Sequence, residues 1–252
     1  MDNKVLFNSI LPKLEGLNPD VSAFIEDHGG DVLREKLRTV YCMLEEENEK
    51  MNLTSLHGES SVLLHLFDSL MLARAVASLC DSGSLPASPQ FCDVGCGGGF
   101  PSLPLAAALP DIRLTSVDST AKKLGFVAGC AAQTKVLLNT LPARAEELPD
   151  KGYRCRFAAV TARAVAKLSV LSELCLPLTA VGGYFLPMKT DESELADAAG
   201  ALKKLGGVCE DTVRYSLFSD TERFSRVIFV IKKAFDAPEY PRKYAKILKN
   251  PL

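Results

Sequence analysis

The segment Phe91–Pro101, which reads F-C-D-V-G-C-G-G-G-F-P, constrains the fold more than any other part of this sequence. It begins with mostly apolar residues, as in a buried strand. The glycines that follow permit positive φ angles and close approach of a ligand to the backbone. Pro101 fits the first turn of a helix, where its missing amide hydrogen would have no partner within the helix anyway. The segment therefore predicts a strand, a tight ligand-binding loop and a helix.

The positions of the glycines distinguish between two kinds of nucleotide-binding loop. A dinucleotide-binding G-x-G-x-x-G motif that started at Gly95 would need glycine at position 100, where this chain has Phe100. The motif D-x-G-x-G-x-G fits at every position from Asp93 to Gly99. It is the methyltransferase form, in which an amino-acid moiety lies against the loop. We therefore predict an S-adenosylmethionine site that includes Gly95, Gly97 and Gly99.

Short apolar runs alternate with helical stretches after residue 88, which indicates parallel β-α units. Five runs are expected to form parallel strands: Phe91–Val94, Ile112–Val117, Val136–Leu138, Phe157–Val160 and Tyr184–Leu186. Two later runs, Val208–Leu217 and Arg226–Ile231, are joined by a segment too short for a crossover helix, so we expect them to pair antiparallel. The predicted fold is α/β, with the Rossmann-like seven-stranded sheet of a class I methyltransferase.

The residues before this domain have a helical pattern. Apolar residues recur at the spacing of an amphipathic helix over residues 33–44, and a second helical run spans roughly residues 59–79. Pro, Gly and Ser are then concentrated between positions 81 and 89, which marks a linker. We predict a small helical N-terminal region, residues 1–87, followed by an S-adenosylmethionine-binding α/β domain, residues 88–252.

An acidic residue follows the glycine loop at the spacing of a ribose-binding carboxylate. Asp118 ends the second predicted strand, about 20 residues after the loop, where a carboxylate meets ribose hydroxyls. The alternative is a helix N-cap, which Asp118 and Ser119 both suit. Ser119 can cap while Asp118 binds, so the two interpretations are compatible, and we favour ribose binding.

Two further segments follow later strands. Ala145 and Glu146 come after the third strand and can meet the adenine edge of a cofactor, although an ordinary charged helix start explains this segment better when it is taken alone. Arg163 ends the fourth strand, and its guanidinium can hold the cofactor carboxylate or a substrate phosphate. The alternative is a surface arginine at a helix start, which the helix dipole disfavours.

Motifs for two kinds of nucleobase methylation are missing. Exocyclic amine methylation commonly uses an N/D-P-P-aromatic motif after the fourth strand, but residues 161–164 read T-A-R-A. Methylation of pyrimidine C5 needs a thiolate, typically from a Pro-Cys element, and this chain has no Pro-Cys dipeptide. The 7-nitrogen of guanine has a lone pair and no proton, so attack there requires no general base. The missing motifs fit that acceptor without selecting it, and we assign no catalytic residue beyond a positioning role for Arg163.

The composition indicates a soluble cytoplasmic protein. The 252 residues carry a net charge of −2, so nucleic-acid binding would have to use a local patch. No unbroken apolar run approaches the roughly 18 residues of a membrane span, and residues 1–17 lack a signal-peptide core. The eight cysteines form no C-x-x-C pair, and the three histidines lie far from most of them. We expect reduced structural thiols, no metal and no membrane partner.

An ordered set of motifs makes a family resemblance specific. They are M-N-L-T-S at residues 51–55, H-L-F-D-S at 65–69, the loop at 93–105, V-D-S at 117–119, K-K at 122–123, R-A-E at 144–146, A-R-A at 162–164 and M-K at 188–189. With these motifs the chain, from about Leu37 to the C-terminus, resembles the RsmG (GidB) family of bacterial small-subunit ribosomal RNA guanine-N(7) methyltransferases. The resemblance implies a cytoplasmic enzyme that modifies one guanine in a ribosomal loop.

The resemblance also assigns residues and partners. It implies cofactor contacts at Gly95, Phe100, Ala145, Glu146 and Arg163. It implies that ribosomal RNA or a ribosomal particle is the partner, and we expect a monomer. The chain departs from the family pattern at residues 47–48, 101–104 and 190, where Trp-Asn, Pro-Gly-Ile-Pro and Gly are usual. These departures concern local packing and RNA contacts and leave the cofactor positions intact.

Two groups of polar residues have competing interpretations. His65, Asp68 and Ser69 share one helical face. One interpretation is a catalytic His65–Asp68 pair. The other is a polar clasp that fixes the helical region against the α/β domain. With no proton to abstract, we favour the clasp. Residues 241–252 hold four basic residues and no acid, as in a solvated tail or an RNA contact. We predict phosphate contacts at Lys122, Lys123, Arg242, Lys243, Lys246 and Lys249, with no part of the tail in the cofactor pocket.

Two other functions remain open at this point. A small-molecule methyltransferase can use the same fold, because fold does not fix substrate. An RNA-binding ribosome assembly factor with a relict cofactor pocket is the alternative that is not an enzyme. The intact loop from Gly95 to Gly99 argues against the second.

Overall fold

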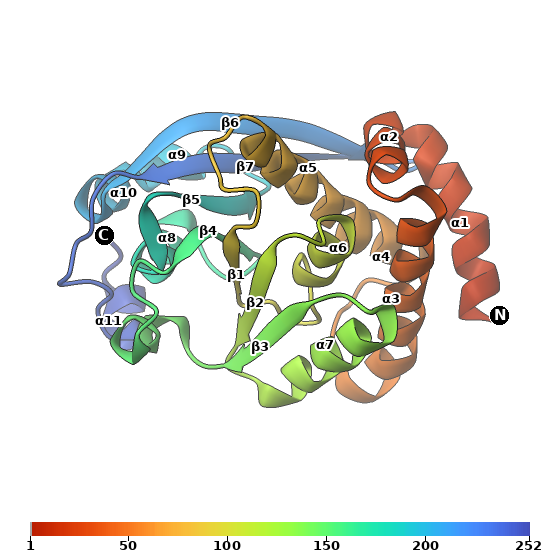
Figure 1. Ribbon diagram of the computed structural model, residues 1–252, viewed down its shortest axis with the longest axis horizontal. Helices are drawn as coiled ribbons and strands as arrows, with labels where there is room; N and C mark the ends of the chain where they lie inside the picture. The colour runs from red at the N-terminus through yellow and green to blue at the C-terminus, as the bar shows by residue number, and fades with distance from the viewer. Residues whose placement is uncertain (1) are drawn as a thin grey trace.

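The computed structural model describes residues 2–252, and its central feature is a seven-stranded sheet (Figure 1). The strands are β1 Gln90–Val94, β2 Arg113–Asp118, β3 Leu138–Pro142, β4 Phe157–Arg163, β5 Thr179–Lys189, β6 Gly207–Phe218 and β7 Arg223–Lys233. They lie in the order β3-β2-β1-β4-β5-β7-β6. β1 to β5 pair in parallel, while β7 is antiparallel to both β5 and β6. The predicted fold class and the closing hairpin are confirmed.

One strand lies later in the chain than we predicted, at Leu138–Pro142 instead of Val136–Leu138. The preceding helix ends at Thr134, and Lys135 has the left-handed conformation that closes such a helix end. The Val136 N–H then donates to the Ala131 carbonyl, so Val136 belongs to the helix cap. Its apolar side chain is buried by this cap, which explains why it resembles a strand residue in the sequence.

Helices cover both faces of the sheet. The N-terminal helices are α1 Asn3–Leu17, α2 Pro19–Asp27, α3 Gly30–Met51, α4 Gly58–Ser61 and α5 Asp68–Asp81, with a π-helical segment, Val62–Phe67, between α4 and α5. The α/β domain adds α6 Ser102–Ala108, α7 Ala121–Thr134, α8 Leu168–Cys175, α9 Glu194–Asp197, α10 Ala199–Leu205 and α11 Tyr244–Lys249. The N-terminal helices pack with α6 and α7 on one face, and α8, α10 and α11 lie on the other.

The N-terminal helices share their hydrophobic core with the sheet. Leu37 and Tyr41 of α3 belong to the same buried cluster as Phe91 of β1 and Leu103 of α6. The continuous helix over residues 58–81 is long and apolar enough to cross a membrane, but 61% of its most apolar window is buried inside the protein. Its composition is therefore that of a core helix.

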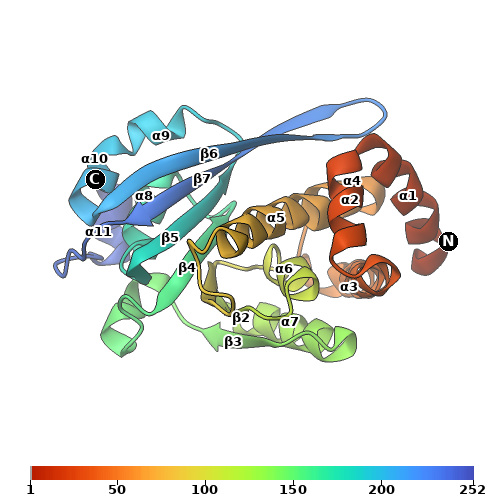
Figure 2. The same ribbon diagram turned by 45° about the horizontal axis from the view of Figure 1, so that its top comes forward.

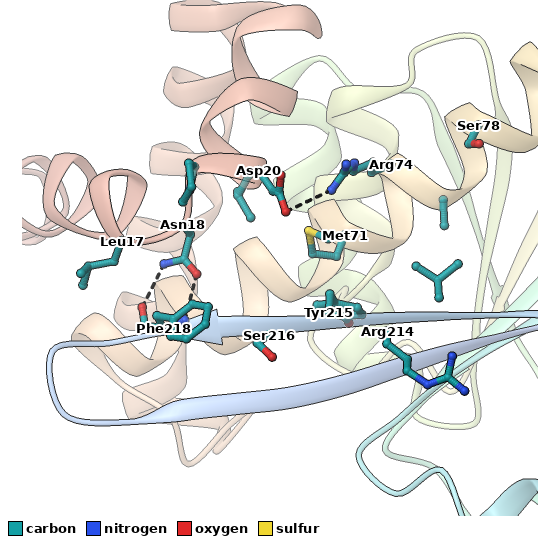
Figure 3. Close-up of a pocket in the computed structure, with 14 residues that line it drawn as sticks. Leu17, Asn18, Asp20, Met71, Arg74, Ser78, Arg214, Tyr215, Ser216 and Phe218 are labelled. Carbon is teal, nitrogen blue, oxygen red and sulfur yellow. Dashed lines mark hydrogen bonds and ion pairs between the residues drawn. The ribbon is translucent and has the colours of Figure 1, made fainter.

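The β6–β7 hairpin extends beyond the sheet and reaches the N-terminal helices (Figure 2). Asn18, between α1 and α2, donates to the Phe218 carbonyl and accepts from the Phe218 N–H, both at 2.9 Å (Figure 3). A cavity of about 560 Å³ lies beside this contact, between α2, α5 and β6, with an ion pair of Asp20 and Arg74 at its edge. None of the cofactor residues that we predicted lines this cavity.

Candidate functional site

The glycine loop wraps around the carboxyl end of β2. The N–H groups of Gly95 and Cys96 both donate to the Val117 carbonyl, at 2.8 and 3.0 Å. Gly95 has a φ of +75°, and a Cβ there would lie 2.5 Å from Val165 Cγ2. Glycine is therefore required at this position for the turn and for packing against the segment that follows β4.

The other two glycines of the motif have different surroundings. A Cβ on Gly99 would lie 2.5 Å from Leu103 Cδ1, so this glycine lets α6 pack closely on the loop. Gly97 also has a positive φ, +54°, but no heavy atom lies within 4 Å of where its Cβ would be. Open space at Gly97, next to a backbone held in place, is what a ligand contact at this residue requires.

Asp118 is held by the backbone on both sides of the site. Its Oδ2 accepts from the Gly97 N–H at 3.0 Å, and its Oδ1 accepts from the Thr120 N–H at 2.8 Å. Thr120 occupies the N-cap position of α7, without a capping hydrogen bond from its side chain, so the predicted capping role of Ser119 is wrong. Each carboxylate oxygen keeps a second lone pair, so Asp118 can organise the loop and still accept from ribose hydroxyls.

A cavity of about 290 Å³, here called the cofactor cavity, opens at the carboxyl ends of β1 and β2. It brings together four of the predicted cofactor residues, which are Gly95, Asp118, Ala145 and Glu146. The other four predicted residues, Gly97, Gly99, Phe100 and Arg163, do not line it.

Sequence reasoning missed several residues of the cofactor cavity. Lys123, which we predicted to contact RNA, lines the cavity instead of standing apart from it. Val165 and Leu174 line it from the segments after β4. Tyr244 of α11 lines it as well, so our expectation that the C-terminal tail stays outside the pocket is wrong. No local motif marks Tyr244, because its place depends on how residues 240–252 pack on α8.

Arg163 connects the end of β4 to the N-terminal helices. Its Nη1 donates to Asp68 Oδ2 at 2.9 Å and to the Leu64 carbonyl at 2.7 Å, and its Nη2 lies 3.1 Å from His65 Nδ1. Asp68 also accepts from the Tyr215 hydroxyl at 2.8 Å, which ties β6 to the same point. The predicted clasp between the helical region and the α/β domain is present, and Arg163 is its centre.

His65 is part of this clasp. Its ring is stacked on Phe100, with centroids 4.6 Å apart, and its Nε2 lies 2.8 Å from Thr54 Oγ1. Burial, helped by the nearby Arg163 charge, lowers the pKa of His65 to about 3. The imidazole is therefore neutral at pH 7 and its Nδ1 accepts from Arg163, which leaves the catalytic interpretation without support.

A second cavity, of about 310 Å³, lies at the carboxyl ends of β4 and β5 beside the clasp. Arg163, Lys189 and Arg226 contribute its cationic groups, and His65 and Asp68 line it as well. It adjoins the cofactor cavity, because two consecutive residues line the two cavities. Ala164 lines the second cavity, and Val165 lines the cofactor cavity.

Asp93, the first residue of the loop motif, is a titratable group that we did not predict as a site residue. Its side chain is fully buried, and its Oδ2 accepts from the Ser102 hydroxyl at 2.6 Å. Its Oδ1 has no hydrogen-bond partner among residues 2–252. Burial raises the pKa of Asp93 to about 6. The motif itself, with an acid inside a buried strand, was the signal for this residue.

The basic residues of the tail separate into two kinds. Lys243, Lys246 and Lys249 are exposed, as is Lys122 on α7. Arg242 is different, because its guanidinium forms an ion pair with the buried Glu173 at 2.6 Å. Arg242 therefore anchors the tail to α8, and its predicted RNA contact stays a prediction.

All eight cysteines are free. Burial raises the pKa of the thiols of Cys92, Cys96, Cys130 and Cys175. Within the described range, residues 2–252, no three His, Cys, Asp or Glu side chains are grouped so that they could hold a metal ion.

The sheet order and the loop at the ends of β1 and β2 define a class I methyltransferase. The precorrin-6y C5,15-methyltransferase of Geobacter metallireducens has a similar fold, with a TM-score of 0.50 and 16% identity over 65% of this chain and 88% of that chain. A profile described as "GidB: rRNA small subunit methyltransferase G" matches residues 33–215.

Curated relatives agree with this profile. The ribosomal RNA small subunit methyltransferase G of Staphylococcus aureus (strain bovine RF122 / ET3-1) is 41% identical over 224 residues, 87% of this chain and 90% of its own length. That of Limosilactobacillus fermentum is 41% identical over 236 residues, 90% of this chain and 94% of its own length. The chain belongs to the rRNA small subunit methyltransferase G family, as its motifs predicted.

Proposed function

We propose that this protein transfers the methyl group of S-adenosylmethionine to the 7-nitrogen of a guanine in small-subunit ribosomal RNA. The observation that carries the proposal is the pair of adjoining cavities at the carboxyl ends of the parallel strands, one beside Gly95 and Asp118 and the other beside Arg163. Ligands of open α/β sheets bind at this edge. The names of the relatives, ribosomal RNA small subunit methyltransferase G, support ribosomal RNA as the acceptor.

The residues of the loop fit the cofactor. Gly97 offers backbone with open space in front of it, and Asp118 has lone pairs left for ribose hydroxyls. Ala145 and Glu146 would meet the adenine edge in the same cavity. When bound, S-adenosylmethionine supplies a methyl group on a sulfonium centre that a lone pair attacks in line, so positioning supplies much of the catalysis.

The second cavity is the proposed place of the guanine. Arg163 and Arg226 supply positive charge beside a nucleotide phosphate. Attack by the 7-nitrogen requires no general base, and His65 is a poor one, because its pKa is lowered to about 3 and its Nδ1 lone pair accepts from Arg163. In this mechanism Arg163 joins the N-terminal helices to the end of β4 and positions the acceptor. The clasp uses three of its five N–H groups, so two are left to donate to the acceptor.

Phosphate contacts with RNA are proposed for Lys122, Lys243, Lys246 and Lys249, the predicted residues that stay exposed. We propose that the protein acts in the cytoplasm as a monomer, on ribosomal RNA or on a ribosomal particle.

The test is mass mapping of methylated nucleotides in small-subunit ribosomal RNA from cells with and without the protein. One guanine should lose its 7-methyl group when the protein is absent and regain it with the purified enzyme. Methyl transfer to metabolites instead of RNA would identify a small-molecule methyltransferase. If calorimetry detected no S-adenosylmethionine binding, an assembly factor would be the better description.

A further inference from the structure

The C-terminal helix α11 contributes to the cofactor cavity. Tyr244, its first residue, lines this cavity together with Asp118 at the end of β2 and with Ala145 and Glu146 in the segment after β3. We propose that Tyr244 is a cofactor-binding residue that covers the adenosine part of S-adenosylmethionine. The inference rests on the function proposed above and adds a binding residue from outside the loop and the strand ends.

An ion pair with α8 fixes the chain just before Tyr244. Glu173 is fully buried, and its carboxylate accepts from the Arg242 backbone N–H at 2.8 Å, from Nε at 2.8 Å and from Nη2 at 2.6 Å. Breaking a buried pair leaves an uncompensated charge, so such a contact holds its segment firmly. The next residue of α8, Leu174, lines the cofactor cavity. The anchor and the cavity wall are thus neighbours on one helix.

The packing of α11 gives its two faces different surroundings. Ile247, one turn after Tyr244, is fully buried against the core on this side of the sheet, and Tyr244 packs against the same core. Lys246 and Lys249 are exposed to solvent. The tyrosine is therefore held on the packed side of the helix, at the cavity.

The chemistry of an aromatic ring at this place matches the adenosine part of the cofactor. The nearby Asp118 suits ribose hydroxyls, and Ala145 with Glu146 suits the edge of a base, which leaves the flat face of the base to be covered. A tyrosine ring covers such a face with large contact area and little loss of conformational entropy. Removing the ring should weaken cofactor binding about tenfold.

The chain contains no tryptophan, which permits a direct test. A Tyr244→Trp variant carries a single tryptophan at the cofactor cavity. A Phe235→Trp variant carries a single tryptophan at an exposed residue that does not line this cavity. Titration with S-adenosylhomocysteine should change the fluorescence of the first variant in a saturable way and leave that of the second unchanged. Unchanged fluorescence of Tyr244→Trp, with calorimetry still detecting binding, would overturn the inference.

Affinity measurements complete the test. Calorimetry with S-adenosylhomocysteine should give a dissociation constant about tenfold higher for Tyr244→Ala and within about twofold of the unmodified protein for Tyr244→Phe. Equal affinity of the alanine variant would contradict a binding role. If the unmodified protein bound neither S-adenosylmethionine nor S-adenosylhomocysteine, the proposed function would fail and this inference with it, so the two failures are distinguishable.

Discussion

Single residues of the glycine loop have separable tasks, although the motif presents them as one pattern. Gly95 and Gly99 avoid collisions with Val165 and Leu103, so their requirement for glycine comes from the protein itself. Gly97 meets no protein atom and donates its N–H to Asp118, so its requirement comes from backbone conformation and from the ligand. A substitution at Gly97 therefore separates binding from folding better than one at its neighbours.

We expect Gly97→Ala to weaken S-adenosylmethionine binding by at least tenfold while the protein remains folded. The added methyl group enters the open space that the cofactor needs, and the positive φ costs on the order of 1 kcal/mol of stability. Gly58→Ala is the matched control, because Gly58 has nearly the same φ, +55°, its Cβ would also meet no atom within 4 Å, and it lies outside the glycine loop. Calorimetry and urea unfolding should show equal stability losses but different affinities, and equal affinities would contradict the ligand contact.

Asp93 should make stability depend on pH. Its pKa is raised from the ordinary value of 3.8 to about 6, so the folded protein binds more protons than the unfolded chain between these values. Stability therefore falls as pH rises through this window, and the loss, on the order of 3 kcal/mol, persists at pH 7. Asp93→Asn removes this dependence. Urea unfolding at pH 4, 5, 6 and 7 measures the free energy of unfolding of both proteins. The difference between the two free energies should change with pH, and a constant difference would show that burial does not perturb the pKa of Asp93.

At the scale of helices and strands, the sequence predicted what local patterns encode. The central parallel strands β1, β2 and β4 are mostly buried, and this burial produced the apolar runs from which they were predicted. The pair Arg242–Glu173 joins residues 69 positions apart, and no periodicity indicates it. The π-helical segment before α5 was also invisible in the sequence, although it places His65 and Asp68 on Arg163. What depended on long-range packing, Tyr244 above all, could not be predicted.

One asparagine contributes buried hydrogen bonds between the hairpin β6–β7 and the N-terminal helices. Asn18 is buried and makes two bonds with the Phe218 backbone and one with the Leu14 carbonyl. Asn18→Ala leaves the Phe218 N–H and carbonyl without these partners, which should lower the free energy of unfolding by roughly 2–3 kcal/mol. Asn139→Ala, at an exposed position of β3, is the control and should change it by less than about 0.5 kcal/mol. Urea unfolding measures both, and equal effects would show that the hairpin contact contributes no stability.

In the whole molecule, the N-terminal helices and α11 lie at opposite ends of the sheet (Figure 1, Figure 2). Each end contributes to one of the two cavities. The helices supply His65 and Asp68 to the second cavity, and α11 supplies Tyr244 to the cofactor cavity. Both segments lie outside the strands and the loop that define the fold class. The proposed reaction site is thus lined by residues from the N-terminal helices and from α11 as well as from the strands and the loop.

The exposed lysines of the tail test where RNA lies on this molecule. Replacing Lys243, Lys246 and Lys249 by glutamine should weaken binding to small-subunit ribosomal RNA and lower the log–log salt slope by roughly 0.7–0.9 for each lost phosphate contact. Affinity for S-adenosylmethionine without RNA should stay the same, because none of these lysines lines the cofactor cavity.

A control variant with glutamine at Lys4, Lys36 and Lys135 removes the same charge from other parts of the chain, and it should leave the slope unchanged. Filter binding over a range of salt concentrations measures both variants. If the tail variant kept its slope and affinity, the phosphate-binding surface would lie elsewhere. Arg223 and Arg226 line a hollow that adjoins the second cavity, and their charges would then be the next to neutralise.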